Sequence, residues 1–409
     1  MVLRRTVIAI VTAVLAACSG CQTQAEHKKA ARQRWEKATA GIKLTLAQQQ
    51  YENGKYEQAE QTVLECIKAE PDNPQPRLLL GKLLLARGRS DEAVGQLSLA
   101  VQLDSGLHEG WYWLGVATQE NRNYGQACKY YSKALSLRPG NVSYILAVAD
   151  VQAAENNFSK ALELLTEKMA ALPRDVSLRV AAADLLHRLG ENKRAIELYK
   201  QAILLTSDNE AIAEALGYCY LFSDKWEEAA EIFETLAEQC RDEQKRKLYL
   251  QVTALCSMNT AQYGKAIKSY SQLSVAERDN AEIWVKMGHA ALGAGAVNRA
   301  LKCGQKALAL RFAYADAIAL VGCAQYVSGD YVAAADSFRR ITVDKKNGWF
   351  SWLMQARCYE RLGETTRAKR AYEKALELNP DSELAVLLAK GENSKIDAYH
   401  GGIRPQMED

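Results

Sequence analysis

Proline and phenylalanine are scarce in this chain. The 409 residues include 7 prolines and 6 phenylalanines, against 19 tyrosines. Because proline breaks helices and strands, its scarcity predicts long helical segments that carry an amphipathic aromatic residue at a repeated position. The apolar share of 48% and the charged share of 25% exclude a disordered or collagen-like chain and allow a large core.

The chain also lacks an excess of one charge. Its formal net charge is +3, and removal of a leader with Arg4 and Arg5 would leave 50 basic against 49 acidic residues. Nucleic acid is therefore not expected as a partner. The densest basic stretch outside the leader is Lys28, Lys29, Arg32 and Arg34. It suits either contact with anionic lipid or a solvated helix face.

Catalytic motifs are missing as well. The sequence has no G-x-S-x-G and no glycine-rich phosphate loop between a strand and a helix. No two of its five histidines share a helix at zinc-ligand spacing. Asp184 and His187, three residues apart, could bind the edge of a metal site or form a surface hydrogen bond. Residues 1–39 and 383–409 are too short for a catalytic domain, so we expect no enzyme, cofactor or bound metal.

The N-terminus has the pattern of an export signal. Arg4 and Arg5 precede an apolar segment of 12 residues, Thr6–Ala17, which is too short to span a bilayer as a helix. The segment ends in Leu-Ala-Ala followed by Cys18, which resembles the bacterial lipobox. The resemblance implies a signal peptide over 1–17, acylation of Cys18 and membrane anchoring through that lipid.

Two alternatives remain for this region. Cys21 is a second candidate for acylation, although no aliphatic residue stands at the required place before it; a plain secretory signal is the other. By resemblance, Ser19 after the cysteine favours the periplasmic face of the outer membrane. The expected location is therefore the bacterial envelope.

An internal repeat dominates the rest of the chain. Alanines recur with a spacing of 34 residues eight times and 37 once, at Ala59, Ala93, Ala127, Ala161, Ala195, Ala229, Ala266, Ala300, Ala334 and Ala368. The third repeat also has the motif residues Trp111, Leu114, Gly115, Ala127, Tyr131, Ala134 and Pro139. This pattern resembles the tetratricopeptide repeat, a helix, turn and helix of 34 residues. The resemblance implies an all-α fold, a right-handed α-α superhelix of about ten helical hairpins.

The spacing predicts the organisation of the chain. A tether over 18–39 leads into ten repeats over 40–73, 74–107, 108–141, 142–175, 176–209, 210–243, 247–280, 281–314, 315–348 and 349–382. A capping helix over 383–390 covers the last repeat, and a disordered tail occupies 391–409. The three extra residues near Arg241–Lys247 are expected to lengthen the second helix of the sixth repeat or the loop after it.

Small residues mark the predicted helix crossings. Gly81, Gly115, Gly217, Gly288 and Gly322 share one position in the first helix of their repeats, where a missing side chain lets the second helix approach. The position of Tyr131 in the second helix holds a bulky residue elsewhere, but Gly304 in the eighth repeat. We therefore expect looser packing of the eighth hairpin.

The ten cysteines are interpreted mainly as small core residues. Cys219, Cys256 and Cys358 share one repeat position, too far apart to bridge, and Cys66 takes a position that alanine holds in other repeats. No disulfide framework is expected. Cys240 and Cys256, which flank the insertion, are the pair to inspect.

By resemblance, the first helix of each repeat lines an inner groove. The corresponding side chains here include Tyr112, Gln119, Asp150, Asp184, His187, Tyr218, Phe222, Met258, His289, Tyr326, Phe350 and Arg357. They lack the lysine and asparagine set with which some members clamp a C-terminal carboxylate. Such a groove suits an extended peptide or an amphipathic helix, although Tyr218 and Tyr326 could instead seal neighbouring helices.

Two functions fit these patterns. The first is a non-catalytic scaffold or adaptor, tethered in the bacterial envelope, that binds protein or peptide segments during pilus, secretion or outer-membrane assembly. The second is an array that binds a small molecule or metal, or a regulatory subunit of an enzyme, with Asp184, His187 and His289 as polar anchors.

Overall fold

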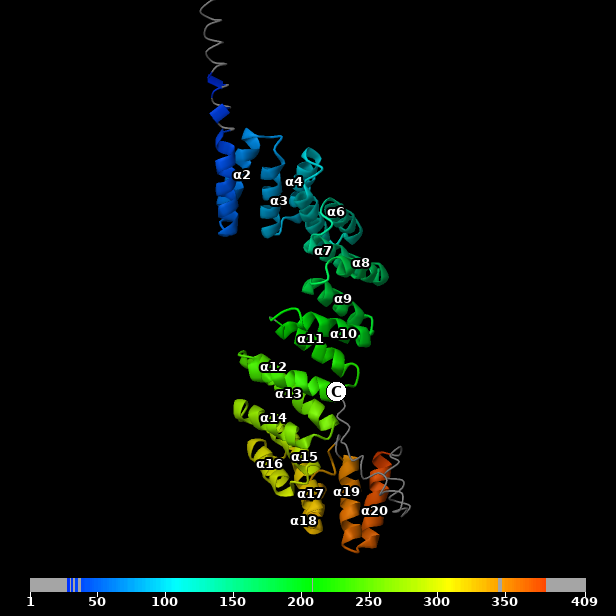
Figure 1. Cartoon of the computed structure of the whole chain (residues 1–409). Coiled ribbons are helices and arrows are strands. Elements are labelled where there is room, and N and C mark those ends of the chain that lie inside the picture. Colours follow the sequence, from blue (N-terminus) through cyan, green and yellow to red (C-terminus); the bar gives the residue numbers. More distant parts are fainter. Residues whose placement is uncertain are drawn as a thin grey trace, which may run out of the picture. The chain divides into compact units, whose positions relative to one another are not determined.

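The computed structural model describes residues 28, 29, 31, 34, 35 and 38–379, apart from 208 and 345–347. All regular elements in this part of the chain are α-helices, which confirms the predicted all-α fold of helical hairpins (Figure 1). The chain divides into two compact units, one up to Thr206 and one from Ser207. Cys18 and the predicted signal peptide, capping helix and disordered tail lie outside the described residues.

The N-terminal unit is a series of antiparallel helices joined by short turns. A first helix over 38–52 is followed by α2 (Tyr56–Ala69), α3 (Pro74–Ala86), α4 (Ser90–Leu103), α5 (His108–Glu120), α6 (Tyr124–Leu137), α7 (Val142–Ala154), α8 (Phe158–Ala171), α9 (Val176–Arg188) and α10 (Asn192–Ile203). From α2 on, each helix contacts the next one in the chain.

The C-terminal unit repeats this arrangement. Its helices are α11 (Glu210–Leu221), α12 (Trp226–Gln239), α13 (Glu243–Asn259), α14 (Tyr263–Ala276), α15 (Ala281–Gly293), α16 (Val297–Leu310), α17 (Ala315–Val327), α18 (Tyr331–Arg339), α19 (Gly348–Arg361) and α20 (Thr365–Leu378). Here too each helix packs against its neighbour in the sequence. In both units the odd-numbered helices are the first helices of their hairpins.

Local signals fix where the helices begin and turn. Asn73, Asn141 and Asp175 each accept a hydrogen bond from a backbone N–H in the first turn of the helix that follows, which satisfies a donor that the helix itself leaves free. Within each hairpin the turn contains one residue with positive φ at the same repeat position, at Gly54, Gly88, Arg122, Asn156, Gly190, Asp224, Ala261, Gly295, Gly329 and Gly363. Glycine supplies six of these left-handed residues, because it adopts that conformation without steric cost.

The aligned alanines lie at the helix crossings. Nine of the ten are fully buried, and Ala368 nearly so. The glycines of the first helices face the bulky residue of the second helix, as predicted. A Cβ on Gly115 would lie 2.5 Å from the Tyr131 ring, and one on Gly217 2.8 Å from the Phe233 ring. No side chain fits there, since core packing leaves no free volume.

The eighth hairpin is packed as tightly as the others, so the expectation of loose packing is wrong. Gly304 in α16 leaves space beside Gly288 in α15. Leu320 of α17, the next hairpin, fills it, and a Cβ on either glycine would meet Leu320 or Val321. Leu320 and Gly304 are both buried. The missing volume is therefore supplied by the neighbouring repeat.

The insertion lies in a different element from the one expected. Helix α12 keeps the ordinary length of 14 residues, whereas α13 has 17 residues against 13 in most first helices. Asp242 caps α13 by accepting hydrogen bonds from the backbone N–H groups of Gln244 and Lys245. This cap starts the helix at Glu243, so the boundary predicted at 247 falls inside α13.

The cysteines in the described residues are all free thiols. Cys66, Cys219, Cys256 and Cys358 are buried, as expected of small core residues. Cys240 is half-buried and unpaired with Cys256, and burial raises the pKa of the Cys256 thiol to about 11. None of the helices described here combines the length and hydrophobicity needed to cross a bilayer.

Candidate peptide-binding groove

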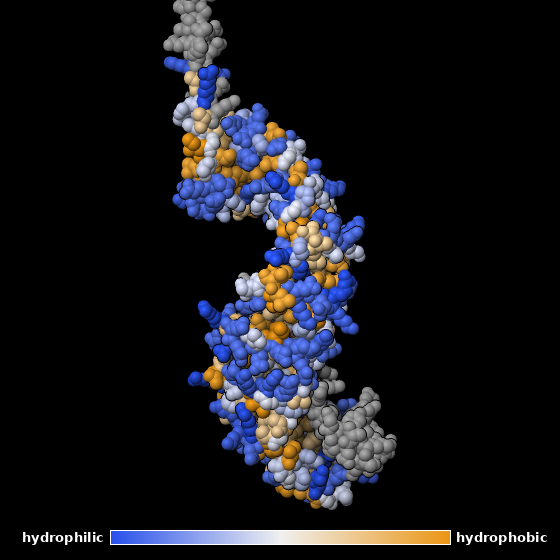
Figure 2. All heavy atoms as spheres, in the orientation of Figure 1, coloured by the Kyte–Doolittle hydropathy of each residue, from blue (hydrophilic) through white to orange (hydrophobic). Residues whose placement is uncertain are grey.

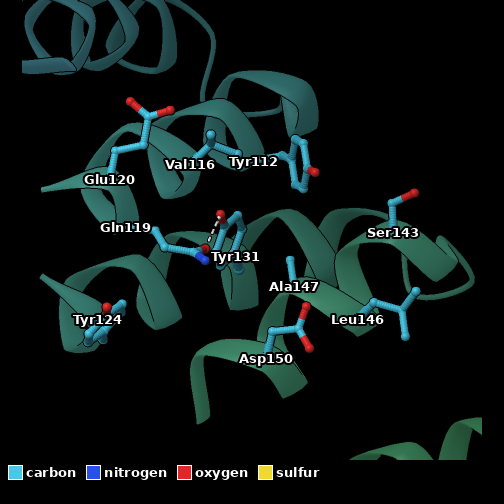
Figure 3. Close-up of a pocket in the computed structure, with 10 residues that line it drawn as sticks. All are labelled: Tyr112, Val116, Gln119, Glu120, Tyr124, Tyr131, Ser143, Leu146, Ala147 and Asp150. Carbon is cyan, nitrogen blue, oxygen red and sulfur yellow. Dashed lines mark hydrogen bonds between the residues drawn. The ribbon is translucent and has the colours of Figure 1, made fainter. Parts of the chain in front are cut away.

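The first helices of successive hairpins lie close enough to form a shared surface. Contacts between helices two apart in the chain join α3 to α5, α7 to α9 and α15 to α17. In the N-terminal unit this surface is hollowed between α5, α6 and α7 into a pocket of about 640 Å³ (Figure 3). Its lining residues are Tyr112, Val116, Gln119, Glu120, Tyr124, Tyr131, Ser143, Leu146, Ala147 and Asp150.

Tyr112 and Tyr131, which line this pocket, belong to a cluster of tyrosine rings. The ring of Tyr112 on α5 stacks on that of Tyr144 on α7, with centroids 5.0 Å apart, and lies 5.5 Å from the ring of Tyr131. The Tyr144 hydroxyl is 2.8 Å from Nδ1 of His108. Tyr144 is buried and does not line the pocket, so it supports the Tyr112 ring, and aromatic rings of this kind bind apolar and cationic side chains.

Tyr131 reaches the pocket from the core. Its ring is buried beside Gly115, and its hydroxyl donates a hydrogen bond of 2.8 Å to Oε1 of Gln119 (Figure 3). Burial, together with nearby Tyr112 and Asp150, raises the pKa of this hydroxyl, so it stays a donor. The bond orients the Gln119 amide at the rim of the pocket.

Two carboxylates also line the pocket. Asp150 on α7 is exposed to the pocket, and Glu120 on α5 also lines it. Desolvation in the concave surface and the carboxylate of Asp184 raise the pKa of Asp150, against the opposing effect of Arg188. A carboxylate whose charge is poorly solvated gains free energy when a cation approaches it. The tyrosine rings and the carboxylates together suit a lysine or arginine side chain.

Asp184 and His187 on α9 make separate hydrogen bonds. The Tyr199 hydroxyl donates to Oδ1 of Asp184. Nδ1 of His187 lies 2.7 Å from Oδ1 of Asn192. Each of these bonds thus joins the side chain to the second helix of its own hairpin, and neither of them joins Asp184 to His187, the surface pair expected from their spacing. Among the described residues, no group of three or more His, Cys, Asp or Glu is placed to hold a metal ion.

In the C-terminal unit the predicted groove residues are dispersed. Tyr218 packs edge-on against Phe233 at 5.3 Å, and Phe350 against Phe338 at 6.2 Å, so both seal neighbouring helices. Tyr326 packs on Tyr331 at 5.4 Å, with the Arg357 guanidinium 5.9 Å from its ring. Met258 is half-buried, whereas Phe222, at the C-cap of α11, is 69% exposed.

His289 on α15 is a half-buried member of this set. Burial lowers the pKa of its imidazole, and the Asp316 carboxylate opposes that shift. The imidazole is therefore neutral at physiological pH, which suits packing against neighbouring helices more than binding of an anion.

Three of the twelve predicted groove residues, Tyr112, Gln119 and Asp150, line this pocket, and Tyr326 and Arg357 lie together in the C-terminal unit. The other seven lining residues, including Tyr124 and Tyr131, were not predicted as site residues. The periodic position of Tyr131 correctly indicates a buried ring. The period says nothing about the hydroxyl, which extends past the core to the surface.

Comparison with known sequences identifies the repeat. Tetratricopeptide repeat models match residues 108–141, 349–382, 44–108 and 186–250. The first two ranges coincide with the third and tenth repeats that the alanine spacing gives.

Curated relatives resemble the chain over short segments. It is 29% identical over 104 residues to an N-terminal acetyltransferase A complex subunit-like protein of Schizosaccharomyces pombe, a match that covers 25% of this chain and 15% of the relative. It is 25% identical over 171 residues to the human protein O-mannosyl-transferase TMTC1, covering 41% of this chain and 19% of that protein. The chain thus spans less than a fifth of either relative.

Among solved structures, PilF of Pseudomonas aeruginosa matches 52% of this chain and 97% of its own at 15% identity, with a TM-score of 0.44. A Naa15/Naa10 complex bound to HypK-THB matches 90% of this chain and 69% of its own at 15% identity, with a TM-score of 0.38. The family matches, the 34-residue period and the stacked hairpins together show that this chain is built from tetratricopeptide repeats.

Proposed function

We propose that the chain is a non-catalytic scaffold that binds an extended polypeptide segment along its first helices. The observation that carries this proposal is the pocket between α5, α6 and α7, which is lined by Tyr112 and Tyr131 and by the carboxylates of Asp150 and Glu120. The tyrosine rings are already fixed by their contacts with each other. A ligand that binds them does not have to order these side chains, so binding costs little conformational entropy. Open access from the surface suits a side chain of a peptide that continues beyond the pocket.

The polar groups of the pocket specify the ligand further. Asp150 has a raised pKa through desolvation and the nearby Asp184 carboxylate, and the Gln119 amide is held at the rim by Tyr131. A basic side chain would stabilise the charged form of Asp150, and the amide would bind the peptide backbone. The favoured ligand is an extended segment in which a lysine or arginine stands among apolar residues.

The relatives are consistent with a binding role. The chain is 27% identical over 113 residues to an N-terminal acetyltransferase A complex auxiliary subunit of Arabidopsis thaliana, covering 28% of this chain and 13% of that protein. A subunit of that kind is named for its place in a complex. We extend to this chain only the general role of holding other polypeptides.

Fluorescence anisotropy with labelled peptides tests the pocket. The probes are a peptide of alternating lysine and valine and a matched peptide with glutamate in place of lysine. The lysine peptide should bind more tightly, and Asp150→Asn or Tyr112→Ala should weaken its binding by about tenfold. Glu163→Gln, which removes an exposed carboxylate from α8, is the matched control and should leave the Kd unchanged. Equal binding of both peptides, unaffected by either pocket variant, would overturn the proposal.

We further propose that this scaffold is anchored in the bacterial envelope by acylation of Cys18, where it assists assembly of a pilus, a secretion system or the outer membrane. The support is the sequence Leu-Ala-Ala-Cys at residues 15–18 after a short apolar segment. Intact mass and membrane fractionation of the protein from its host, beside a Cys18→Ala variant, test the anchor. A lipid-sized mass increment and membrane association that both disappear in the variant are expected. A soluble, unmodified product would refute the anchor while leaving the peptide-binding proposal intact.

A further inference from the structure

The first helix of the array has apolar side chains on two faces. One face packs against α2 and buries Ala40 and Ala47. The other face exposes Ile42 at 72% and Leu46 at 47%. Trp35, seven residues before Ile42, is 64% exposed. Spacings of 7 and 4 residues place these three side chains on a single stripe of the helix. Figure 2 shows apolar surface at this end of the described chain.

The repeat shows what such positions do elsewhere. The residue at the position of Ile42 is buried in every later repeat, as Pro76, Gly110, Tyr144, Leu178, Ile212, Tyr249, Ile283, Ala317 and Ser351. The residue at the position of Leu46 is also buried in eight of the nine later repeats, with half-buried Val321 the exception. Exposure of Ile42 and Leu46 is therefore peculiar to the first repeat.

These positions contact the preceding hairpin. A Cβ on Gly110 would lie 2.8 Å from Val101 of α4. The ring of Tyr249 packs on Phe233 of α12 at 5.9 Å, and the Gln355 amide donates to the Ala335 carbonyl of α18 at 3.1 Å. In the described chain no hairpin precedes the first helix. A terminal repeat that ends an array normally has a polar outer face, whereas this one keeps isoleucine and leucine at the packing positions.

We infer that this stripe is an interface in which the first helices of two copies of this chain pack antiparallel across a two-fold axis. The repeat register indicates that the occupant is a helix, since a helix of the preceding hairpin covers the same positions at Gly110, Tyr249 and Gln355. A second copy supplies such a helix. In a two-fold pair each copy covers the apolar stripe of the other, so no stripe remains exposed to bind a third copy. This inference is independent of the peptide pocket.

The charges of the helix favour the antiparallel orientation. Exposed Lys28, Lys29 and Arg34 precede the helix over 38–52, and exposed Glu52 stands at its end. With the axis near residue 40, the basic residues that precede one helix lie beside the acidic end of the other, and Trp35 lies opposite Leu46. Ala38 is then close to the axis, and a Cβ on Gly41 would meet nothing within 4 Å. Small residues there allow the two helices to approach closely.

Sedimentation velocity over a concentration series tests the dimer. Every sample is the full chain with Cys18→Ala, so that no acyl chain contributes. A monomer–dimer equilibrium is expected, and Ile42→Asp combined with Leu46→Asp should raise its Kd by at least about tenfold. The matched control is Val332→Asp, at a residue of α18 that is 68% exposed, and it should leave the equilibrium unchanged. Circular dichroism should show equal helix content in all samples.

Charge exchange tests the orientation. Glu52→Lys alone should weaken the dimer, and adding Lys28→Glu and Lys29→Glu should recover part of the loss. A chain that stays monomeric at all concentrations would overturn the inference, as would a dimer insensitive to the Ile42 and Leu46 changes. Flotation with phosphatidylglycerol vesicles distinguishes a lipid surface from a second copy. Vesicle binding by a monomeric chain, lost in the double variant, would assign the stripe to the membrane and refute the dimer.

Discussion

In the third and eighth hairpins, the space beside the glycine of the first helix is filled by side chains from different helices. In the third, Gly115 on α5 faces Tyr131 of its own second helix, α6. In the eighth, Gly288 on α15 faces Gly304 on α16, and Leu320 of the next hairpin fills the space. Both crossings are closed. The repeat position therefore fixes a volume to be filled, and either neighbouring helix can supply the atoms.

At each crossing, the size of the residue from the next hairpin matches the space that the second helix leaves. Leu320 and Ala147 occupy the same repeat position, one after the eighth hairpin and the other after the third. A large Tyr131 is paired with a small Ala147, and a missing side chain at Gly304 with a large Leu320. Because packing density is uniform in protein cores, a larger side chain at one position requires a smaller side chain at the other. The small Ala147 also leaves room for the pocket beside Tyr131.

The largest expected effect comes from removing the side chain that closes the eighth hairpin. Leu320→Ala leaves a cavity between α15, α16 and α17, and should lower the free energy of unfolding by about 2–5 kcal/mol. Urea unfolding followed by circular dichroism measures it. Ala147→Gly, at the equivalent position after the third hairpin, should cost only about 0.5–1 kcal/mol through backbone entropy. Equal losses in the two variants would contradict the comparison.

Overpacking the third hairpin should have the next largest effect. Gly115→Leu directs a side chain into the Tyr131 ring, 2.5 Å from the position of its Cβ, and should destabilise by about 1–3 kcal/mol. Gly95→Leu, in the exposed middle of α4 with nothing within 4 Å of its Cβ, is the control. It should stabilise slightly, because leucine favours the helix over glycine by several tenths of a kcal/mol. Thermal melts of Gly115→Leu that match the unmutated chain would show that the assigned crossing is wrong.

A double variant that exchanges the large and the small side chain between α16 and α17 tests whether the two positions share one space. Gly304→Leu and Leu320→Ala, made together, return the bulky residue of the eighth hairpin to its own second helix. The double variant should be more stable than the two single changes predict when added, with a coupling of about 0.5–3 kcal/mol. A double-mutant cycle in urea gives this quantity. Strict additivity would mean that the two positions do not share one space.

The smallest effect concerns pH. Burial lowers the pKa of His289 in the eighth hairpin, with Asp316 opposing. The unfolded chain therefore takes up a proton more readily than the folded one. The contribution of neutral His289 to the free energy of unfolding is fully present above the pKa of histidine in the unfolded chain, about 6.5. It is lost as the pH falls from there through the lower pKa of the folded chain. His289→Gln should remove this part of the pH dependence, so a urea midpoint that falls equally with pH in both proteins would count against burial of His289.

Much of the fold could be predicted from the sequence because each repeat places small and bulky residues at fixed intervals. The alanine spacing gave ten hairpins, and Gly115 and Gly217 mark real helix crossings. The insertion was misplaced since the period counts residues without showing which helix holds them. The cap at Asp242 decides that, and an Asp ahead of Glu243 was the available signal.

The site was harder to predict than the fold. The resemblance to the tetratricopeptide repeat assigns the first helices to the groove, and three of the residues that it selects, Tyr112, Gln119 and Asp150, line the pocket. Neither the resemblance nor the repeat period shows where neighbouring helices leave a hollow, because that depends on the sizes of residues in adjacent repeats, such as Tyr131 and Ala147. Tyr218 and Phe350, two other predicted groove residues, instead pack against Phe233 and Phe338.

The most direct test of polypeptide binding is site-specific photocrosslinking in the native host. Benzoylphenylalanine replaces Ser143, which lines the pocket, or Lys133, which is exposed on α6 outside it. The account predicts that the probe at Ser143 forms a discrete set of crosslinks to other polypeptides, that Asp150→Asn reduces them, and that the probe at Lys133 does not form them. The same crosslinks from both positions, or none from Ser143, would contradict binding in this pocket.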